Sequence, residues 1–193
     1  MPSSSLARWF RSQATLLNDI EAVHRFVRGS GQGARAAVQQ INQAYVMFLS
    51  AQFQAFCRNL YVECVDAFVR PLASADYRLL VSNNMTLHLK LDRGNPNPGN
   101  IGSDFNRLGL LLWALVDFHH PRNPRRKAAI EELNEWRNAI AHEDYPPSMF
   151  SGGRLQLKLA RVRNWRACCN GLARSFVDVM WSHLKTVTGQ APW

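Results

Sequence analysis

Three stretches of the chain repeat apolar residues at spacings of three and four, the pattern of helices that bury one face. The longest covers residues 34–69 and contains no proline or glycine before Pro71 ends it. The second covers residues 6–28 and ends at the glycine-rich segment 29–33. The third covers residues 164–187. We expect each stretch to form a helix that packs against the others.

The predicted helix 34–69 carries many aromatic side chains, which could pack in a core or line a ligand pocket. Core packing is favoured, because apolar stripes of this kind are usually buried against neighbouring helices. The stripe consists of Ile41, Tyr45, Phe48, Leu49, Phe53, Phe56, Leu60, Cys64 and Phe68.

The middle of the chain is less regular. Residues 77–81 fit a short helix and residues 85–91 alternate enough for a short strand, and the pattern decides neither. Residues 92–104 predict a surface loop, because they contain three glycines and two prolines. Ser103 or Asp104 can cap a following helix that runs to about residue 118.

Another helix is predicted to begin with Asn123 as its cap and Pro124 in its first turn. It runs to about His142, before the prolines at 146 and 147. Leucines alternate with polar residues at 155–159, which fits a short strand. The fold class is therefore all-α, an up-and-down bundle of four to five helices with room for one short β-hairpin, in a single domain over residues 1–193.

Several functional classes lack support in the sequence. The apolar run at residues 108–116 is too short to span a bilayer, and residues 1–11 do not resemble a secretory signal. We therefore expect a soluble, cytoplasmic protein without a membrane partner. The four cysteines form no C-x-x-C pair and suit buried thiols. No residue pattern predicts a metal site or a cofactor.

The chain is strongly basic, with 23 Lys and Arg against 14 Asp and Glu, a net charge of +9 and a pI near 10.0. Almost all of the excess is arginine, whose guanidinium group matches phosphate oxygens in geometry. A phosphate-bearing partner such as RNA would explain this excess. A GC-rich genome, in which arginine codons are common, explains it equally well.

Candidate chemistry lies at the end of the predicted helix 123–142. Arg137 and Asn138 are followed by His142. The apolar face of this helix consists of Ile130, Leu133, Trp136 and Ile140, and Arg137 falls at its edge. In a chain of this composition, an Arg-Asn pair followed by a histidine at such a spacing is expected about 0.1 times by chance.

This segment resembles the signature of the HEPN superfamily. In that signature an arginine, usually followed by a polar residue, precedes a histidine at the end of a helix in an all-α bundle. Arg137, Asn138 and His142 match it position by position, and the resemblance in sequence covers about residues 128–145. The resemblance implies a metal-independent endoribonuclease that acts as a homodimer, with two motif helices forming one composite cleft.

In that mechanism His142 acts as general base or acid at the ribose 2′-hydroxyl or the leaving 5′-oxygen. Arg137 stabilises charge on the scissile phosphate, and Asn138 orients either residue or the phosphate. The resemblance suggests a toxin, antiviral defence or RNA-processing context, in which an antitoxin or regulatory protein often blocks the cleft. The alternatives are a non-catalytic module that binds RNA, a nucleotide or a protein, and a purely structural dimerisation domain.

A basic connector precedes the motif helix. It can guide RNA by contacting phosphates, or it can be a solvated loop, and the two interpretations have equal weight. The candidate RNA-binding residues are His119, His120, Arg122, Arg125, Arg126 and Lys127. Trp165 lies in a second basic run, where burial is favoured over stacking on RNA.

Overall fold

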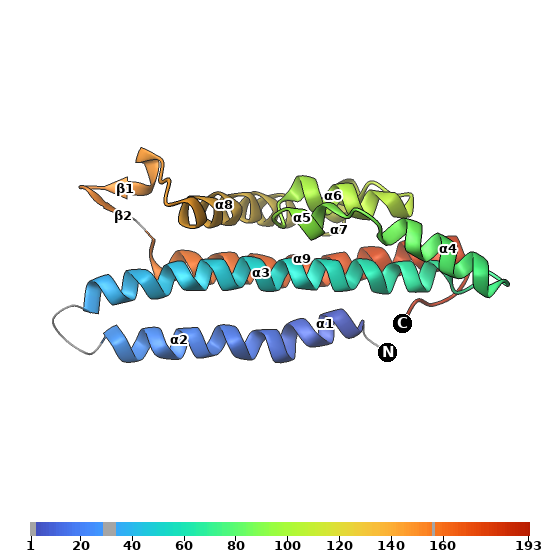
Figure 1. The fold of residues 1–193 in the computed structure, drawn as a ribbon, viewed down its shortest axis with the longest axis horizontal. Coiled ribbons are helices and arrows are strands. Elements are labelled where there is room, and N and C mark those ends of the chain that lie inside the picture. The colour runs from blue at the N-terminus through green and yellow to red at the C-terminus, as the bar shows by residue number, and fades with distance from the viewer. Residues whose placement is uncertain (1–2, 29–33, 156) are drawn as a thin grey trace.

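In a computed structural model the chain is almost entirely helical (Figure 1). The structure describes residues 3–28, 34–155 and 157–193. Over these ranges the all-α prediction is confirmed, but the helices outnumber the predicted four to five. They are α1 (Ser4–Arg8), α2 (Ala14–Arg28), α3 (Ala34–Val69), α4 (Ala75–Thr86), α5 (Lys90–Arg93), α6 (Pro98–Phe105), α7 (Leu112–His119), α8 (Asn123–His142) and α9 (Leu159–Thr188).

The helices form three layers (Figure 1). Helices α1 and α2 form one layer, α3 and α9 lie side by side in the middle, and α8 lies with α5, α6 and α7 in the third. The long helices α2, α3, α8 and α9 run alternately in opposite directions, as in an up-and-down bundle. A two-stranded antiparallel hairpin of β1 (Phe150–Ser151) and β2 (Arg154–Leu155) lies beyond the end of α8. No helix in the described ranges is both long and apolar enough to cross a membrane.

The predicted helix 6–28 is helical from Ser4 onward, but a π-helical segment (Trp9–Gln13) separates α1 from α2. Trp9 is buried, and its indole Nε1 donates a hydrogen bond of 2.9 Å to Asn170 Oδ1 on α9. This contact joins the first layer to the middle one. Segment 29–33, which the sequence predicts to end the helix, lies outside the described residues.

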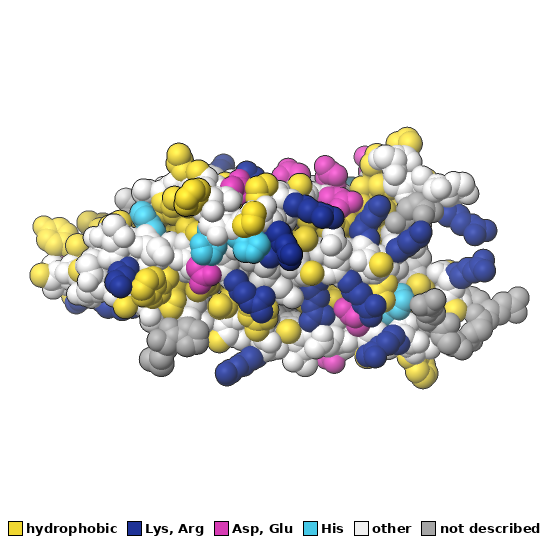
Figure 2. Space-filling model, turned by 180° about the vertical axis from the view of Figure 1, so that it is seen from behind, with side chains coloured by type: hydrophobic (Ala, Val, Ile, Leu, Met, Phe, Trp, Pro, Cys, Tyr) yellow, Lys and Arg dark blue, Asp and Glu magenta, His cyan; other side chains and the backbone are white. Residues whose placement is uncertain are grey.

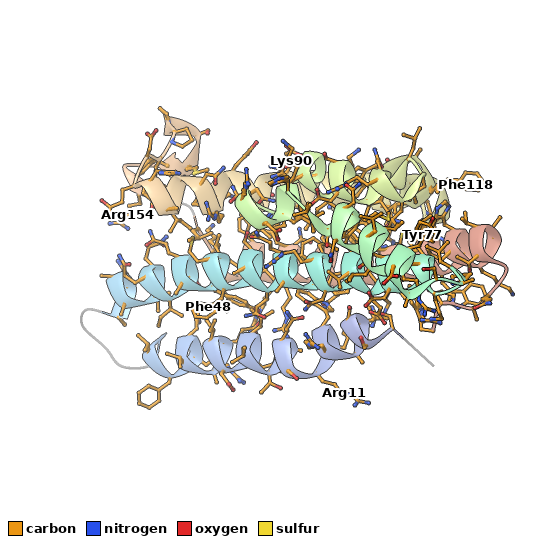
Figure 3. The ribbon with its side chains drawn as sticks, turned by 45° about the vertical axis from the view of Figure 1, so that its right-hand side comes forward. Arg11, Phe48, Tyr77, Lys90, Phe118 and Arg154 are labelled. Carbon is orange, nitrogen blue, oxygen red and sulfur yellow. The ribbon has the colours of Figure 1, made fainter. Side chains whose placement is uncertain are left out.

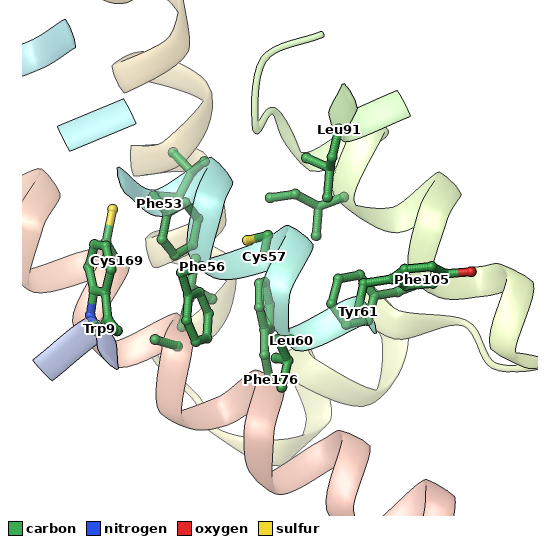
Figure 4. Close-up of a cluster of buried hydrophobic side chains, with 14 of the residues drawn as sticks. Trp9, Phe53, Phe56, Cys57, Leu60, Tyr61, Leu91, Phe105, Cys169 and Phe176 are labelled. Atoms are coloured by element: carbon green, nitrogen blue, oxygen red, sulfur yellow. The ribbon is translucent and has the colours of Figure 1, made fainter. Parts of the chain in front are cut away.

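Helix α3 has the bounds that the sequence predicts, and its aromatic stripe lies in the core. Figure 4 shows Phe53 and Phe56 beside Trp9, and Tyr61 beside Phe105. One member departs from the stripe, because the side chain of Phe48 is 49% exposed. Burial also raises the pKa values of the thiols at Cys57, Cys64 and Cys169 well above their ordinary value, as expected of cysteines that fill apolar space.

The sequence left a short strand at residues 85–91 undecided, and these residues instead end α4 and begin α5. The prediction of a surface loop at residues 92–104 is wrong, because α6 fills much of it and Ile101 is buried. Asp104 does not cap a following helix. Its buried carboxylate accepts hydrogen bonds from the backbone of Lys90 (2.8 Å) and Leu91 (2.9 Å), and so caps α5.

Three further boundaries differ from the sequence prediction. The helix expected to run to about residue 118 is interrupted by a 3₁₀ turn (Asn106–Leu108) and by Gly109 at φ 82°, so that α7 begins at Leu112. The strand expected at residues 155–159 reaches only Leu155 within the described residues. The helix expected at residues 164–187 begins earlier, at Leu159, and forms α9.

Glu63 on α3 holds the start of α1. Its carboxylate accepts hydrogen bonds from the hydroxyls of Ser3 and Ser5 and from the backbone N–H of Ser4 and Ser5. Burial raises the pKa of Glu63, but the hydrogen bonds from these serines outweigh burial and hold the pKa below its ordinary value of 4.5. A carboxylate of this kind stabilises the fold above its unfolded pKa and loses that contribution as the pH falls through its folded pKa.

We predict that Glu63→Gln lowers the free energy of unfolding at pH 7 by about 1–2 kcal/mol, because several donors lose an anionic acceptor. The difference from the wild type should begin to shrink as the pH falls below about 4.5, the ordinary pKa that applies in the unfolded chain, and should vanish as the pH falls through the lower pKa of the folded state, where the native carboxylate becomes protonated. Urea titrations across this pH range measure it. Glu131→Gln, the same change at an exposed position on α8, is the control and should have little effect at either pH. A constant difference from pH 3 to pH 7 would contradict the prediction.

Candidate functional site

The rotation of α8 about its axis is set by its apolar face. Ile130, Leu133 and Trp136 are buried against α3 and α9. Trp136 lies 6.3 Å from Trp165 of α9 between ring centroids, and the indole of Trp165 donates to Glu132 on α8 at 2.8 Å. Trp165 is therefore a core residue, as the sequence favours. With this face buried, the opposite face of α8 is turned to solvent.

Asn138 and His142, four residues apart, lie exposed on that outer face. Helix α8 ends directly after His142, as predicted, because Glu143 adopts the left-handed conformation at φ 54°. The N–H of Glu143 donates to Ile140 O (3.4 Å), and the N–H of Asp144 donates to Ala139 O (3.1 Å). These two bonds form a Schellman motif, which usually places glycine where Glu143 stands. The imidazole therefore lies at a sharp reversal of the chain.

Arg137 is half-buried beside this face. Its Nη1 donates a hydrogen bond of 3.2 Å to Asn138 Oδ1, and the same oxygen accepts from Asn95 Nδ2. Two acidic residues, Glu143 and Asp144, follow the motif in the sequence, but among the described residues Arg137 forms no ion pair with either. Asn138 thus positions the guanidinium of Arg137, and Asn95 holds the carboxamide of Asn138.

Asn95 belongs to the short connection between α5 and α6, whose backbone is held from three directions. Asn134 Nδ2 donates to Pro96 O (3.1 Å), Asn100 Nδ2 donates to Asn95 O (2.8 Å), and Gln54 Nε2 donates to Gly94 O (2.9 Å). Sequence reasoning did not identify Asn95 as part of the site. Nothing in a polar connection signals a contact with a residue 43 positions later, so only the three-dimensional structure could find it.

An open hollow of about 360 Å³ lies beside His142. It is formed by the outer face of α8 and the segment that follows the helix, and it is lined by Glu135, Asn138, Ala139, His142, Asp144, Pro146, Ser148 and Met149. Helical periodicity could have added Glu135 to the predicted site, since it lies one turn before Asn138. Its carboxylate and that of Asp144 leave the rim acidic on this side.

One protomer does not bring Arg137 and His142 together. Asn138 lies between them and contacts Arg137, while Arg137 does not line the hollow beside His142. This agrees with an angle of about 140° between positions five residues apart on a helix. The imidazole of His142 makes no hydrogen bond or ion pair in the described part of the chain and faces solvent, where a substrate can reach it.

The predicted basic connector lies at the other end of α8. At about 1.5 Å per residue, the helix separates Asn123 from His142 by about 28 Å. Asn123, the predicted cap, is buried and does not cap: its Nδ2 donates to Val116 O (2.6 Å) and to Ser175 Oγ (3.1 Å). The connector therefore does not border the hollow of the same protomer.

Four of the six connector residues are already engaged within the chain. His119 pairs with Asp178 (3.4 Å), and His120 Nδ1 accepts from the N–H of Arg122 (3.0 Å). Lys127 lies over the ring of Trp113 at 4.9 Å. Arg126 donates to Asn123 Oδ1 (2.8 Å), and its guanidinium covers Gly171 on α9 so closely that a Cβ there would clash. The side chains of Arg122 and Arg125 are exposed and can contact phosphates.

No protein-family model matches this chain, and no curated protein or solved structure matches it significantly. Within the described residues, no group of three or more His, Cys, Asp or Glu side chains is arranged to hold a metal ion.

Glu143 is a non-glycine residue in the left-handed conformation, which costs about 1 kcal/mol. We predict that Glu143→Gly stabilises the protein by about 0.5–1 kcal/mol and raises Tm by about 1–4 °C. Glu143→Ala keeps the Cβ and so retains the strain, which makes it the matched control. Thermal unfolding of the two variants measures the difference. If the glycine variant proves no more stable than the alanine variant, the strain is not the cause.

Proposed function

We propose that this chain is a HEPN-type, metal-independent endoribonuclease that acts as a homodimer. Arg137, Asn138 and His142 are its catalytic residues, and RNA is its substrate. One observation carries the proposal: the three residues of the motif lie at the surface end of α8, with His142 exposed and Arg137 held by Asn138.

In this proposal the ribose 2′-oxygen attacks the adjacent phosphorus atom while the bond from phosphorus to the 5′-oxygen breaks. His142 takes the proton of the 2′-hydroxyl or gives one to the leaving 5′-oxygen. Arg137 stabilises the negative charge that develops on the phosphate oxygens. The products carry a 2′,3′-cyclic phosphate and a 5′-hydroxyl. DNA lacks the attacking hydroxyl and resists cleavage.

The need for a dimer follows from the angle between the two side chains. Because Arg137 and His142 diverge on one helix, a two-fold axis beside the end of α8 is required to set the arginine of one protomer near the histidine of the other. The exposed face of α8, with Glu135, Asn138 and His142, is free to meet a second copy. The biological context is a toxin, antiviral defence or RNA processing, with an antitoxin or regulatory protein as a partner that covers the same face.

We predict that Arg137→Ala and His142→Ala each reduce RNA cleavage by at least about 100-fold, because each removes a group that acts in the transition state. Cleavage of a labelled RNA, with analysis of the product ends, measures this. Arg125→Ala, which removes an exposed arginine from the other end of α8, is the control and should leave kcat unchanged. Activity that survives His142→Ala, or cleavage of DNA, would contradict the mechanism.

Mixing the two inactive variants tests the composite cleft. Random exchange makes about half of the dimers mixed, and each mixed dimer keeps one of two arginine–histidine pairs, so about a quarter of the wild-type activity should return. Neither variant should recover when mixed with itself. If mixing restores nothing while both variants remain dimeric, the two residues do not act across a dimer axis.

The exposed connector residues should affect binding and leave chemistry unchanged. We predict that Arg122→Ala with Arg125→Ala raises KM for RNA and reduces the salt dependence of binding by about two phosphate contacts, with kcat unchanged. Arg126→Ala should instead lower stability, since its side chain packs on Gly171. Titrations of RNA at several salt concentrations, with thermal unfolding beside them, separate these effects. An unchanged salt dependence would show that the connector does not touch RNA.

A further inference from the structure

An apolar strip lies uncovered along the junction of α2 and α3. Three of its side chains are large and about half exposed: Leu16 (48%) and Val23 (52%) on α2, and Phe48 (49%) on α3. Figure 3 shows Phe48 between the ribbons of α2 and α3. We call this strip the α2–α3 face, and it consists of Leu16, Ile20, Val23, Ile41, Ala44, Phe48 and Ala51.

Two hydrogen bonds set α2 antiparallel to α3. Tyr45 Oη donates to Glu21 Oε1 (2.7 Å), and Gln13 Nε2 donates to Gln52 O (3.1 Å). The segment from Gln13 to Glu21 therefore lies beside the segment from Tyr45 to Gln52. The exposed apolar residues of the two helices accordingly lie next to one another.

Helix α9 covers the other side of this helix pair. Arg166 on α9 donates to Asn18 Oδ1 (2.8 Å), and Arg163 forms an ion pair with Glu21 (2.8 Å). Leu16 and Val23 lie about 140–160° round the axis of α2 from Asn18. They therefore face away from α9.

On α3 the uncovered side has one large side chain between small ones. Ala44, Phe48 and Ala51 are exposed, and they lie about 140–180° round the helix axis from Phe53, which is buried in the core. Phe48 thus projects between two alanines, each about one turn away. Such a surface can pair with a copy of itself, because a two-fold axis sets the large side chain of one copy against the small ones of the other.

The α2–α3 face contains no charged residue, although the chain carries a net charge of +9. Between Arg35 and Arg58, helix α3 has no charged residue at all, whereas the solvent face of a helix normally carries several. Asp19 lies at the edge of the face. Figure 2 shows the molecule from the α9 side, where Lys and Arg side chains spread over the surface. Two copies of a basic chain repel one another least where both surfaces lack cations.

The face is large enough for a stable contact between two copies. A fully exposed aromatic side chain presents about 200 Å² and an aliphatic one somewhat less, so the face presents about 400 Å² of apolar surface. Interfaces are about 60% apolar, which corresponds to about 1,300 Å² buried in total by two copies. This area exceeds the roughly 1,000 Å² that a specific interface needs.

We propose that the α2–α3 face binds the same face of a second copy of this chain about a two-fold axis. The paired α2 and α3 helices of the two copies then form a four-helix bundle, in which Phe48 of each copy packs against Ala44 and Ala51 of the other. The exposure of Phe48 in one protomer is thereby removed. The contact uses no residue of α8, so it is separate from the proposed nuclease dimer. The two contacts together would join at least four copies.

Sedimentation equilibrium of the full chain at micromolar concentration tests the proposal with Ala44→Glu and Ala51→Glu. Both positions are exposed and glutamate is a good helix former, so each variant should keep the circular dichroism of the wild type. Each change buries a carboxylate in the apolar contact, and we expect the mass of the assembly to fall by at least half. It should fall to two copies if the nuclease dimer forms and to one copy if it does not, so that failure of the nuclease proposal leaves the result readable.

Ala167→Glu is the matched control, since it makes the same change at an exposed position of α9, on the opposite side of the bundle, and should keep the wild-type mass. Ala44→Ser keeps the position small and should also assemble. The proposal is overturned if the wild type is a monomer throughout, or if Ala44→Glu and Ala167→Glu have the same mass. It is likewise overturned if the wild type binds phosphatidylcholine vesicles, Ala44→Glu does not, and their masses in solution are equal, since the face then meets a lipid surface.

Discussion

Helix α3 must be covered on about 200° of its circumference, and this requirement determines where the other long helices lie. Its buried side chains run from Tyr45 on one side through Phe53 and Leu60 to Val65 on the other, an arc wider than the single stripe of a surface helix. Helices α2, α8 and α9 each pack along α3 to close this arc. Burying one such aromatic or aliphatic side chain contributes about 2–3 kcal/mol, so a helix that left its place would expose several of them together.

The candidate site inherits its geometry from this packing. Helix α8 buries Trp136 against the core, so residues on the opposite side of the helix must point outward. Asn138 and His142 are such residues, about 200° and 240° round the helix axis from Trp136. The core fixes the direction of these two side chains. It does not fix the side chain of Arg137, which lies between the buried and the exposed face of α8. The guanidinium of Arg137 is instead held through Asn138, which in turn contacts Asn95 in the connection from α5 to α6. A shift of α6 would therefore reach the guanidinium before it reached the imidazole.

Sequence patterns predicted the elements whose signals are local and failed where distant contacts decide. The ends of α3 and α8 could be read because Pro71 and the prolines after His142 stop a helix wherever it packs. Helix α6 was missed, although Asn97 caps it and Pro98 stands in its first turn, because its glycines have poor helix propensity. Trp113 is one of the distant residues that hold it, since its ring lies against Gly102 and its Nε1 donates to Pro98 O at 2.7 Å. No local pattern records that contact.

The contacts divide the arginines into those that hold the fold and those that are exposed to solvent. Arg107 donates to Asn84 O and Leu87 O and thereby caps the end of α4, a structural task that a phosphate partner would not explain. Arg166 on α9 likewise has a structural role, because it donates hydrogen bonds to Tyr45 on α3 and to Ala14 and Asn18 on α2. Composition alone could not choose between a phosphate ligand and a codon bias, because it counts arginines that hold the fold together with arginines whose guanidinium groups are exposed. The guanidinium groups that can meet a phosphate are those that the fold leaves exposed, and these lie on several elements, among them Arg11 before α2, Arg25 within α2 and Arg122 before α8. If phosphate binding occurs, it is therefore divided among separate places and does not follow one continuous basic face.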